Sequence, residues 1–573
     1  MFHYIKNRLY QLIPILLGIT LLCFAIMYTA TGDAIDVMEA NQGVVYTEAT
    51  KAQMRSELGL DKPFIIQYGL WLKNILSGDM GNSFVSGQPV FSTFMSKLPA
   101  TILLTFSSII CTIIISIPLG IFSAINKNNI FDYIIRCCSF VGNSIPGFFL
   151  SLLLIYIFSL KLNLFPVINN SININSLILP TMTLTIAMSA KYTRQVRIIV
   201  LDELTKEYVL AARSRGIKES VILYKSVLKV CMLSFITLLS LSIGSLLGGT
   251  AIIESIFLWD GVGKMAVDAI IMRDYPIILA YVIWMSFLPE RIAMAEAAVN
   301  TMQLSLKNIT DIKFIIISTL LILLLLLIIF SPWIAPFDPY AQNLNNALLP
   351  PNSIHILGTD RYGRDLFSRI LVGGQLTIFS SLLVVAIITI IGTIIGGICG
   401  YFGGKLDTIL MRIADLFLAF PGIVFAIAVA GVLGGGIYNA IIALACISWP
   451  KYARLSRSQV LALKNTNFIL AAKLSNNSPI QILYKHILPN ILNPILITAT
   501  LDIGTMIMEL AGLSFLGLGA TPPTAEWGLM MSSDRSLLQT SPWVILSPGF
   551  AILITICLFN LFSDTLRDKL TIK

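Results

Sequence analysis

Three carboxylates of this chain stand in or at the end of long apolar runs, where an ionised group is unfavourable and often functional. Asp502, Met506 and Glu509 are spaced by four and three residues, so a helix through that run places all three on one face. Glu254 stands near the end of another run. Such a face offers a path to a cation or an amine. The equal alternative is that each carboxylate pairs with a neighbouring helix.

For other charged residues, local ion pairs are a competing explanation, and for Asp415 the favoured one. Asp415 follows Arg412 by three residues, about one helical turn, which favours a pair between them. The segment GTDRYGRD, residues 358–365, brings two Asp and two Arg within two turns. A local ion-pair network and a functional surface explain these four residues equally well: Asp360, Arg361, Arg364 and Asp365.

No arrangement in the sequence indicates catalysis or a bound cofactor. A P-loop needs Gly-x-x-x-x-Gly-Lys-Ser/Thr, so that backbone N–H groups surround the phosphates. The nearest approaches, Gly263-Lys264 and Gly404-Lys405, lack both the hydroxyl residue and the first glycine. The three His are scattered and the eight Cys form no CxxC pair, so we expect no metal site.

The most informative feature is a basic tract that occurs twice. Residues 191–228 and 451–488 align without a gap at an offset of 260, with 14 of 38 positions identical. Both copies begin Lys-Tyr-x-Arg-x-x-Arg, contain Leu-Ala-Ala and end near Leu-Tyr-Lys. A polar, basic, repeated segment in an apolar chain requires an aqueous partner.

Each tract predicts a short helix that ends in a tight turn. The Ala pairs leave a smooth helix face that another protein can approach closely. Gly216 permits a positive φ at the turn, and Asn476 is the next-best residue for it. An interfacial helix lying on anionic lipid is the alternative, but it does not explain a duplicated pattern.

The composition is typical of an all-α integral membrane protein. Hydrophobic residues make up 56% of the chain and charged residues 12%, about half the charged fraction of a soluble domain. Several apolar runs reach the ~20 residues that span a bilayer, and they do not alternate as barrel strands do. The net charge of +9 fits basic cytoplasmic loops rather than nucleic-acid binding.

About 12 transmembrane helices are expected, in two sets of six. The second set repeats the first, which indicates an internal duplication or a gene fusion. The sixth run is interrupted by Pro289, Glu290 and Arg291. The expected spans are 12–30, 100–125, 137–160, 177–199, 230–257, 276–298, 315–330, 375–402, 409–433, 438–458, 491–514 and 543–564.

The spans divide the chain into two halves joined by a short polar segment. The first half, 1–299, carries an external segment at 31–98 and a basic loop at 191–229. The joint is 300–311, and the second half, 312–573, carries the loop 451–490. Lys and Arg collect in cytoplasmic loops, so both loops, the N-terminus, the joint and the C-terminus are expected in the cytoplasm.

The basic tract resembles the coupling loop of ATP-binding-cassette importer permeases. In that family a short helix of this loop docks on the ATPase subunit. The resemblance rests on Glu207, Ala211, Ala212 and Gly216 in the first copy, and it departs where Lys229 stands for a Pro. In the second copy Ala471 and Ala472 match, whereas Asn467 replaces the Glu and Asn476 the Gly.

The resemblance covers nearly the whole chain. LGLDKPFIIQYGLWL (58–72) and SIPGFFLSLLL (144–154) resemble the first permease of the peptide/nickel branch. LGTDRYGRDLFSRIL (357–371) and SFLGLGATPPTAEWG (514–528) resemble its second permease. The two permeases therefore appear fused here, in a type I importer fold. In the family, the region around 357–371 lies at the outer face near the binding protein.

The family resemblance implies a translocation pore in the plasma or inner membrane. Two separate ATPase subunits hydrolyse ATP, and an extracytoplasmic binding protein delivers the substrate. TGDAIDVMEAN (31–41), ATLDIGTMIMELAG (499–512) and TPPTAEWG (521–528) favour nickel, free or chelated. The alternatives are a di- or oligopeptide importer and, in a different class, a gradient-driven transporter or a channel. A membrane enzyme has no motif to support it.

Overall fold

The structure is a computed structural model. It describes residues 46–57, 59–166, 173–287, 310–418 and 422–571, together with isolated residues between 16 and 39. Within these ranges every regular element is helical, apart from two isolated β-bridges, Asn82–Pro89 and Thr359–Asp365. The all-α class predicted from composition is confirmed for this part of the chain.

The long helices of the described first half follow the predicted apolar runs. The long elements are α5, α8 and α11, and the basic loop lies between α8 and α11. The elements are α3 (Glu48–Glu57), α4 (Phe64–Leu76), α5 (Val90–Ile125), α6 (Ile130–Ser144), α7 (Gly147–Leu154), η1 (Ile155–Lys161), α8 (Ile174–Leu204), α9 (Glu207–Ser214), α10 (Glu219–Val221), η2 (Ile222–Val227), α11 (Leu228–Ile256), α12 (Val262–Ile271) and α13 (Tyr275–Phe287).

The second half has the same order of long helices, namely α17, α20 and α23. Its basic loop lies between α20 and α23. The elements are α15 (Thr310–Ile329), α16 (Ser331–Ile334), η3 (Leu344–Asn346), α17 (Leu366–Phe402), α18 (Gly404–Leu418), α19 (Gly422–Val432), α20 (Ile437–Leu463), α21 (Asn467–Leu474), α22 (Pro479–Gln481), η4 (Ile482–Ile487), α23 (Leu488–Phe515), α24 (Trp527–Ser533), η5 (Arg535–Leu537) and α25 (Trp543–Thr571).

Six helices in the described ranges are long and apolar enough to cross a membrane, or eight if each of two bent pairs counts as one span. Helices α8 and α20 occupy the predicted spans 177–199 and 438–458 but fall outside that set. The C-terminal half of each carries the basic motif, and its charged residues lower the hydropathy of the helix. Most of the predicted span 12–30, the end of 276–298 and residues 300–309 of the joint lie outside the described residues, whereas residues 310 and 311 begin α15.

The prediction of one continuous helix over 137–160 is wrong. The segment begins earlier, at Ile130, and α6 meets α7 at an angle of 103°. Pro146 causes the break, because a proline disfavours helical backbone in the preceding residue, and Ile145 is extended with φ −80° and ψ 121°. The predicted helix over 409–433 is also a bent pair, α18 and α19, at 88°.

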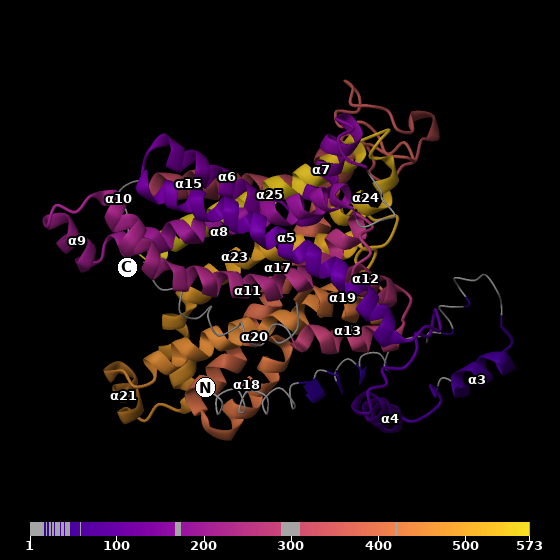
Figure 1. Ribbon diagram of the computed structural model, residues 1–573, viewed down its shortest axis with the longest axis horizontal. Helices are drawn as coiled ribbons and strands as arrows, with labels where there is room; N and C mark the ends of the chain where they lie inside the picture. The colour runs from indigo at the N-terminus through magenta and orange to yellow at the C-terminus, as the bar shows by residue number, and fades with distance from the viewer. Residues whose placement is uncertain are drawn as a thin grey trace. The chain divides into compact units, whose positions relative to one another are not determined.

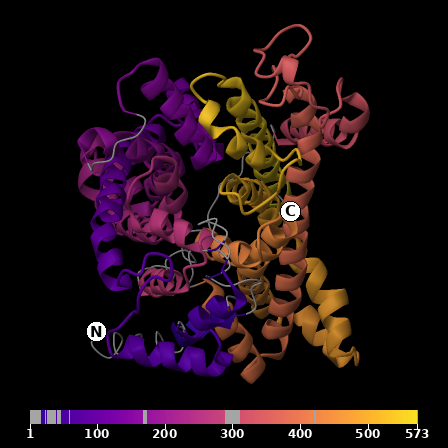
Figure 2. The ribbon, with the colours of Figure 1, turned by 90° about the vertical axis from the view of Figure 1, so that its right-hand side faces the viewer.

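The chain forms two compact units that do not coincide with its two sequence halves. One comprises residues 97–264, and the other comprises 265–287 and the described second half together with the N-terminal segment. In the latter unit, α21 and the segment between α16 and α17 lie at opposite ends of the long helices (Figure 1 and Figure 2). The basic loop and the GTDRYGRD segment are therefore on opposite sides of this unit.

Glycine spacing explains why α17 packs tightly along α20. Gly392, Gly396 and Gly400 recur every four residues on one face of α17. A Cβ added at Gly396 would lie 2.1 Å from the carbonyl oxygen of Ala453, and one at Gly392 would lie 2.5 Å from the Tyr452 side chain. The helix backbones can approach this closely only because the glycines have no side chain.

Replacing Gly396 by Ala is therefore expected to lower stability by about 1–3 kcal/mol, the usual penalty of overpacking. Gly397 is the matched control, because a Cβ at that position meets nothing within 4 Å. Gly397→Ala should leave stability unchanged or raise it through helix propensity. Thermal unfolding of the purified protein in nanodiscs measures both. Equal melting temperatures for the two variants would contradict the close packing of α17 and α20.

Candidate functional site

The two basic tracts fold in the same way. Each runs from a long helix into a short helix, α9 or α21, and returns through a π-helical segment into the next long helix. The π-helical segments, η2 and η4, occupy positions exactly 260 residues apart, as do α9 and α21. The sequence repeat therefore predicted a structural repeat, and the structure has one.

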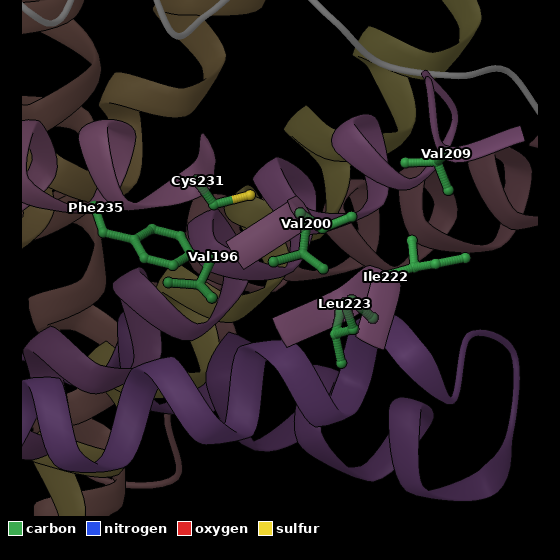
Figure 3. Packing of buried hydrophobic residues seen from close by; sticks show 9 residues of the cluster. Val196, Val200, Val209, Ile222, Leu223, Cys231 and Phe235 are labelled. Atoms are coloured by element: carbon green, nitrogen blue, oxygen red, sulfur yellow. The ribbon is translucent and has the colours of Figure 1, made fainter. Parts of the chain in front are cut away.

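A small apolar core fixes the short helix to its loop. Val209 is the buried residue of α9, and it packs with Val200, Ile222 and Val227, all at most 1% exposed. Figure 3 shows Val209 above Ile222, with Val200 beside them. Ile469, Val460, Ile482 and Ile487 occupy the matching positions in the second loop, and they are equally buried. Each short helix is thus held to the long helices that flank it.

The predicted positive-φ turn after each short helix is confirmed. Gly216 has φ 73° and Asn476 has φ 56°. Two different residues reach the same left-handed conformation, glycine without strain and asparagine with little. Asn477 adds a side-chain bond from its amide nitrogen to the carbonyl oxygen of Ala472, at 3.0 Å, which steadies the second turn.

The structure separates the members of each Ala pair. Ala211 and Ala471 are exposed, whereas Ala212 is half-buried against the apolar core and Ala472 is 6% exposed. Only the first Ala of each pair therefore belongs to a surface that a partner can touch. Beside them the short helices expose apolar side chains, with Leu210 55% and Leu474 90% exposed.

Polar residues at the start of the two short helices differ. Glu207 is exposed in the first turn of α9, where a carboxylate interacts favourably with the helix dipole. Asn467 is the matching residue of α21 and carries no charge. Tyr208 follows Glu207 in α9. Its pKa is raised to about 12, mainly by burial and then by the neighbouring Glu203, so its hydroxyl stays neutral at physiological pH.

One Arg of the repeated motif makes the same ion pair in each half. Arg197 donates from Nε and Nη2 to the two carboxylate oxygens of Asp132, at 2.7 and 2.8 Å. Arg457 does the same to Asp407, at 2.6 and 2.7 Å. This two-bond geometry locks the long helix that enters the basic loop to α6 in the first half and to α18 in the second. Asp132 is fully buried and also accepts from Ser123.

Sequence reasoning did not identify the Asp partners of these pairs. The acceptor precedes its Arg by 65 residues in the first half and by 50 in the second. A repeat search at the single offset of 260 therefore cannot align Asp132 with Asp407. The signal that finds them is a second, shorter repeat at an offset of 275, FDYII (131–135) and LDTIL (406–410).

Asp415 forms its main ion pair with Arg454, the first Arg of the second basic motif. Arg454 Nη2 lies 2.5 Å from Asp415 Oδ1, whereas the predicted partner, Arg412, is 4.0 Å away. Asp415 is therefore ion-paired as expected, but mainly with a residue on α20 rather than with its own helix. Its contribution to stability is small, since both Arg side chains are about half exposed.

Asp502 is paired rather than open. Its Oδ1 accepts from Lys451 Nζ at 2.7 Å, and its Oδ2 accepts from the hydroxyl of the buried Tyr452 at 2.8 Å. Met506 is buried on the same helix, and Glu509 is half-buried. Lys451 is the accessible member of the pair, with 55% of its side chain exposed. On the predicted face of α23 that carries Asp502, Met506 and Glu509, the first carboxylate is thus used in an ion pair with α20.

Glu254 has a capping role in the described structure. Its carboxylate is fully buried and accepts from the Thr101 hydroxyl at 2.8 Å and from the backbone N–H of Lys264 at 2.9 Å. The Thr101 oxygen in turn accepts from the N–H of Val262. The first turn of α12 is thereby tied to α5. Glu254 thus satisfies orphan donors at a helix start.

The second half has the same cap, built from a residue that sequence reasoning missed. Glu526 is fully buried and accepts from the N–H groups of Gly528 and Leu529 and from the Thr377 hydroxyl. Thr377 also accepts from the N–H of Trp527, as Thr101 does from Val262. Burial raises the pKa of Glu526, and these hydrogen bonds act in the opposite direction. Glu526 comes from a different point in the sequence than Glu254, so no fixed offset reveals it.

The GTDRYGRD segment forms the predicted local ion-pair network only in part, because Asp360 pairs with Arg364 whereas Arg361 and Asp365 have partners outside the segment. Asp360 accepts from Arg364 Nε at 2.6 Å, and Arg361 binds Asp534. Asp365 serves a different purpose, since its Oδ2 accepts from the backbone N–H of Ser368 and caps α17. Within the described residues no group of three or more potential metal ligands gathers.

Comparison with known protein families agrees with this architecture. A model described as the binding-protein-dependent transport system inner membrane component matches residues 116–342 and again 392–571. The N-terminal domain model of the same system matches residues 1–105. The chain belongs to this family of transport permeases, and it carries the permease domain twice. It is thus a multi-pass membrane protein with two fused permease domains.

Three similar relatives each match 42% of the chain. The probable D,D-dipeptide transport system permease of Escherichia coli K12 is 46% identical over 242 residues, 42% of this chain and 81% of that protein. The nickel transport system permease of the same strain is 42% identical over 240 residues, 42% of this chain and 87% of that protein. A glutathione transport system permease of Shigella sonnei is 46% identical over 246 residues, which is 42% of this chain and 80% of that protein. The chain is therefore an importer permease of the peptide/nickel group.

Proposed function

We propose that this chain is the complete pore of an ATP-driven importer, in which its two permease halves alternate between outward and inward access. Two ATPase subunits dock on α9 and α21, and an extracytoplasmic binding protein delivers the substrate. The duplicated short helix, held on a buried apolar core in each half, is the observation that carries this proposal. A gradient-driven transporter or a channel has no need for such a pair.

For the substrate, we propose nickel, free or chelated, with a short peptide as the second candidate. The nickel proposal rests on the motifs at 499–512 and 521–528 and on the resemblance to a nickel permease. The relatives named for D,D-dipeptide and glutathione transport favour the peptide. Hydrolysis of ATP belongs to the partner subunits, and no cofactor is assigned to this chain.

Affinity purification and uptake test the proposal together. The tagged chain, expressed with the genes that neighbour its own, should retain two ATPase subunits through purification in nanodiscs. Proteoliposomes loaded with ATP and given the binding protein should then accumulate radioactive nickel or a labelled dipeptide, and competition by the unlabelled compounds identifies the substrate. Accumulation that follows an imposed ion gradient and ignores ATP would contradict the proposal.

Orientation can be measured by cysteine labelling in a background without native Cys. We propose that both basic loops and both termini face the cytoplasm. Ser214 and Ser475 are exposed at the ends of the short helices, and Ser86 is exposed in the segment expected outside. Cys at position 86 should react with an impermeant maleimide in intact cells, and Cys at 214 or 475 only after lysis.

We propose further that the Asp502–Lys451 pair faces the substrate path, with Lys451 as a displaceable cation. Asp502→Asn is then expected to raise the KM for a cationic substrate about tenfold, and Lys451→Gln, which frees the carboxylate, to lower it. Uptake by proteoliposomes and the melting temperature are measured on the same preparation. If both variants lower the melting temperature and leave KM unchanged, the pair is structural only.

A further inference from the structure

A cavity of about 340 Å³ lies beside the GTDRYGRD segment, at the end of its unit opposite the basic loop. Its wall comes from two regions far apart in sequence, the segment that leads into α17 and the segment around α24. Polar residues and apolar ones line it together. The apolar part includes Pro522, Pro523, Leu529 and Met530.

Positive charge exceeds negative charge in this wall. Three guanidinium groups, from Arg361, Arg364 and Arg369, face two carboxylates, from Asp360 and Asp534. Arg364 and Arg369 are 8% and 4% exposed, so they are shielded from bulk water. The imbalance of one positive charge therefore acts in a poorly solvated space, where it attracts an anion strongly.

The carboxylates of the wall are already occupied. Asp360 accepts from Arg364 Nε at 2.6 Å and from the backbone N–H groups of Tyr362 and Arg364. Asp534 accepts from Arg361, whose Nη2 also donates to the carbonyl oxygen of Ser533. Burial raises the pKa of Asp534, while the bond to Arg361 opposes that shift.

The guanidinium groups, in contrast, keep unused donors. Arg364 donates only from Nε to Asp360, and neither of its terminal nitrogens has a hydrogen-bond partner among the described residues. Its plane is held over the Tyr362 ring, 4.7 Å from the centroid. Arg369 donates from Nη1 to the carbonyl oxygen of Pro339 at 2.8 Å, and its Nε is 3.6 Å from Asp360.

We propose that this cavity binds a carboxylate group that enters from the extracytoplasmic side. A carboxylate accepts two parallel N–H bonds from a guanidinium, and the two terminal nitrogens of Arg364 can donate such bonds. Next to the guanidiniums, the Pro and Met surfaces suit the methylene groups that carry such a carboxylate. Its source is an acidic side chain of an external protein or the C-terminus of a transported peptide. The entry side rests on the proposed function, whereas carboxylate binding does not.

Thermal unfolding of the purified chain in nanodiscs, without ATP or partners, tests the proposal with two pairs of probes. N-acetylglutamate α-amide presents a side-chain carboxylate, and N-acetylglutamine amide is its neutral counterpart. D-alanyl-D-alanine presents a peptide C-terminus, and its C-terminal amide is the neutral counterpart. We expect a carboxylate probe at about ten times its Kd to raise the melting temperature by about 2 °C, and its amide to have no effect.

The two pairs of probes distinguish the sources. A shift with the glutamate probe alone assigns the site to an acidic protein side chain, and a shift with the dipeptide alone assigns it to substrate. If both carboxylate probes raise the melting temperature, the cavity binds carboxylates of either source. If neither carboxylate differs from its amide, the proposal is overturned, whatever the outcome of the uptake experiments.

A matched pair of variants places the effect in this cavity. Thr524 lines the cavity and is half-buried. Thr524→Glu supplies a carboxylate from the chain itself, so the variant should lose the shift with the probes. Thr524→Gln has the same size without the charge and should keep it. Equal shifts in the two variants would mean that the probes bind elsewhere.

Discussion

Replacing Ala211 or Ala471 by Glu is expected to reduce ATP-driven uptake about a hundredfold while leaving insertion and melting temperature unchanged. Both residues are exposed on the short helices, so the free chain tolerates a larger side chain there. We propose that in the assembled importer the same position meets the ATPase. An unpaired carboxylate buried in that contact costs several kcal/mol, which is enough to dissociate a protein interface of ordinary affinity.

Two controls define what this result means. Ala211→Ser and Ala471→Ser keep a small side chain and should retain both ATPase binding and uptake. Ala472→Glu places the same charge on the inner side of the helix, where the residue is 6% exposed, and should instead lower stability and yield. Co-purification of the ATPase, uptake and unfolding are measured for each variant. Normal uptake by both outward-facing Glu variants would contradict docking at the short helices.

The difference between the two Ala of each pair shows where sequence reasoning ends. The repeat placed both short helices correctly, and backbone sterics placed the positive-φ turns at Gly216 and Asn476. Which Ala faces outward depends on where the apolar core lies. That core needs Val209 and Ile222 to meet, although 12 other residues separate them. Of the two adjacent Ala that the sequence suggested as a smooth face, only the first is exposed.

Long-range partners account for most of what the sequence did not predict. The helices appear at the predicted apolar runs because hydropathy and chain length determine them locally. The partners of Arg197, Asp502 and Glu254 depend instead on which helices lie side by side. The kink at Pro146 was accessible from local rules, since a proline restricts the residue before it, but the apolar run concealed it.

Each half contains one Arg–Asp ion pair that connects two of its helices, Arg197–Asp132 in the first half and Arg457–Asp407 in the second. The pair joins the helix that leads into the basic loop to α6 in the first half and to α18 in the second, and the apolar core joins the short helix to the same long helix. A displacement of α9 or α21 therefore acts on two helices rather than one. We propose that through this link the movement of an ATPase docked on the short helix displaces a permease half.

Removing this link is expected to affect the two halves unequally. Asp132→Asn leaves Arg197 with 15% of its side chain exposed and without a charged partner, and a buried guanidinium in that state costs about 3–5 kcal/mol. Asp407→Asn leaves Arg457 with 35% of its side chain exposed, so water screens and solvates it, and the expected cost is about 1 kcal/mol. Thermal unfolding in nanodiscs should therefore show a large fall in melting temperature for the first variant and a small one for the second.

Double variants separate the charge from the link that it forms. Arg197→Met with Asp132→Leu removes both charges, so stability should recover substantially, because no buried charge is left alone. The bidentate connection between the helices is still absent, and we therefore expect coupled uptake to remain low while the ATPase still binds. Recovery of uptake together with stability would show that the pair serves folding alone. Equal loss of stability for Asp132→Asn and Asp407→Asn would contradict the role assigned here to burial.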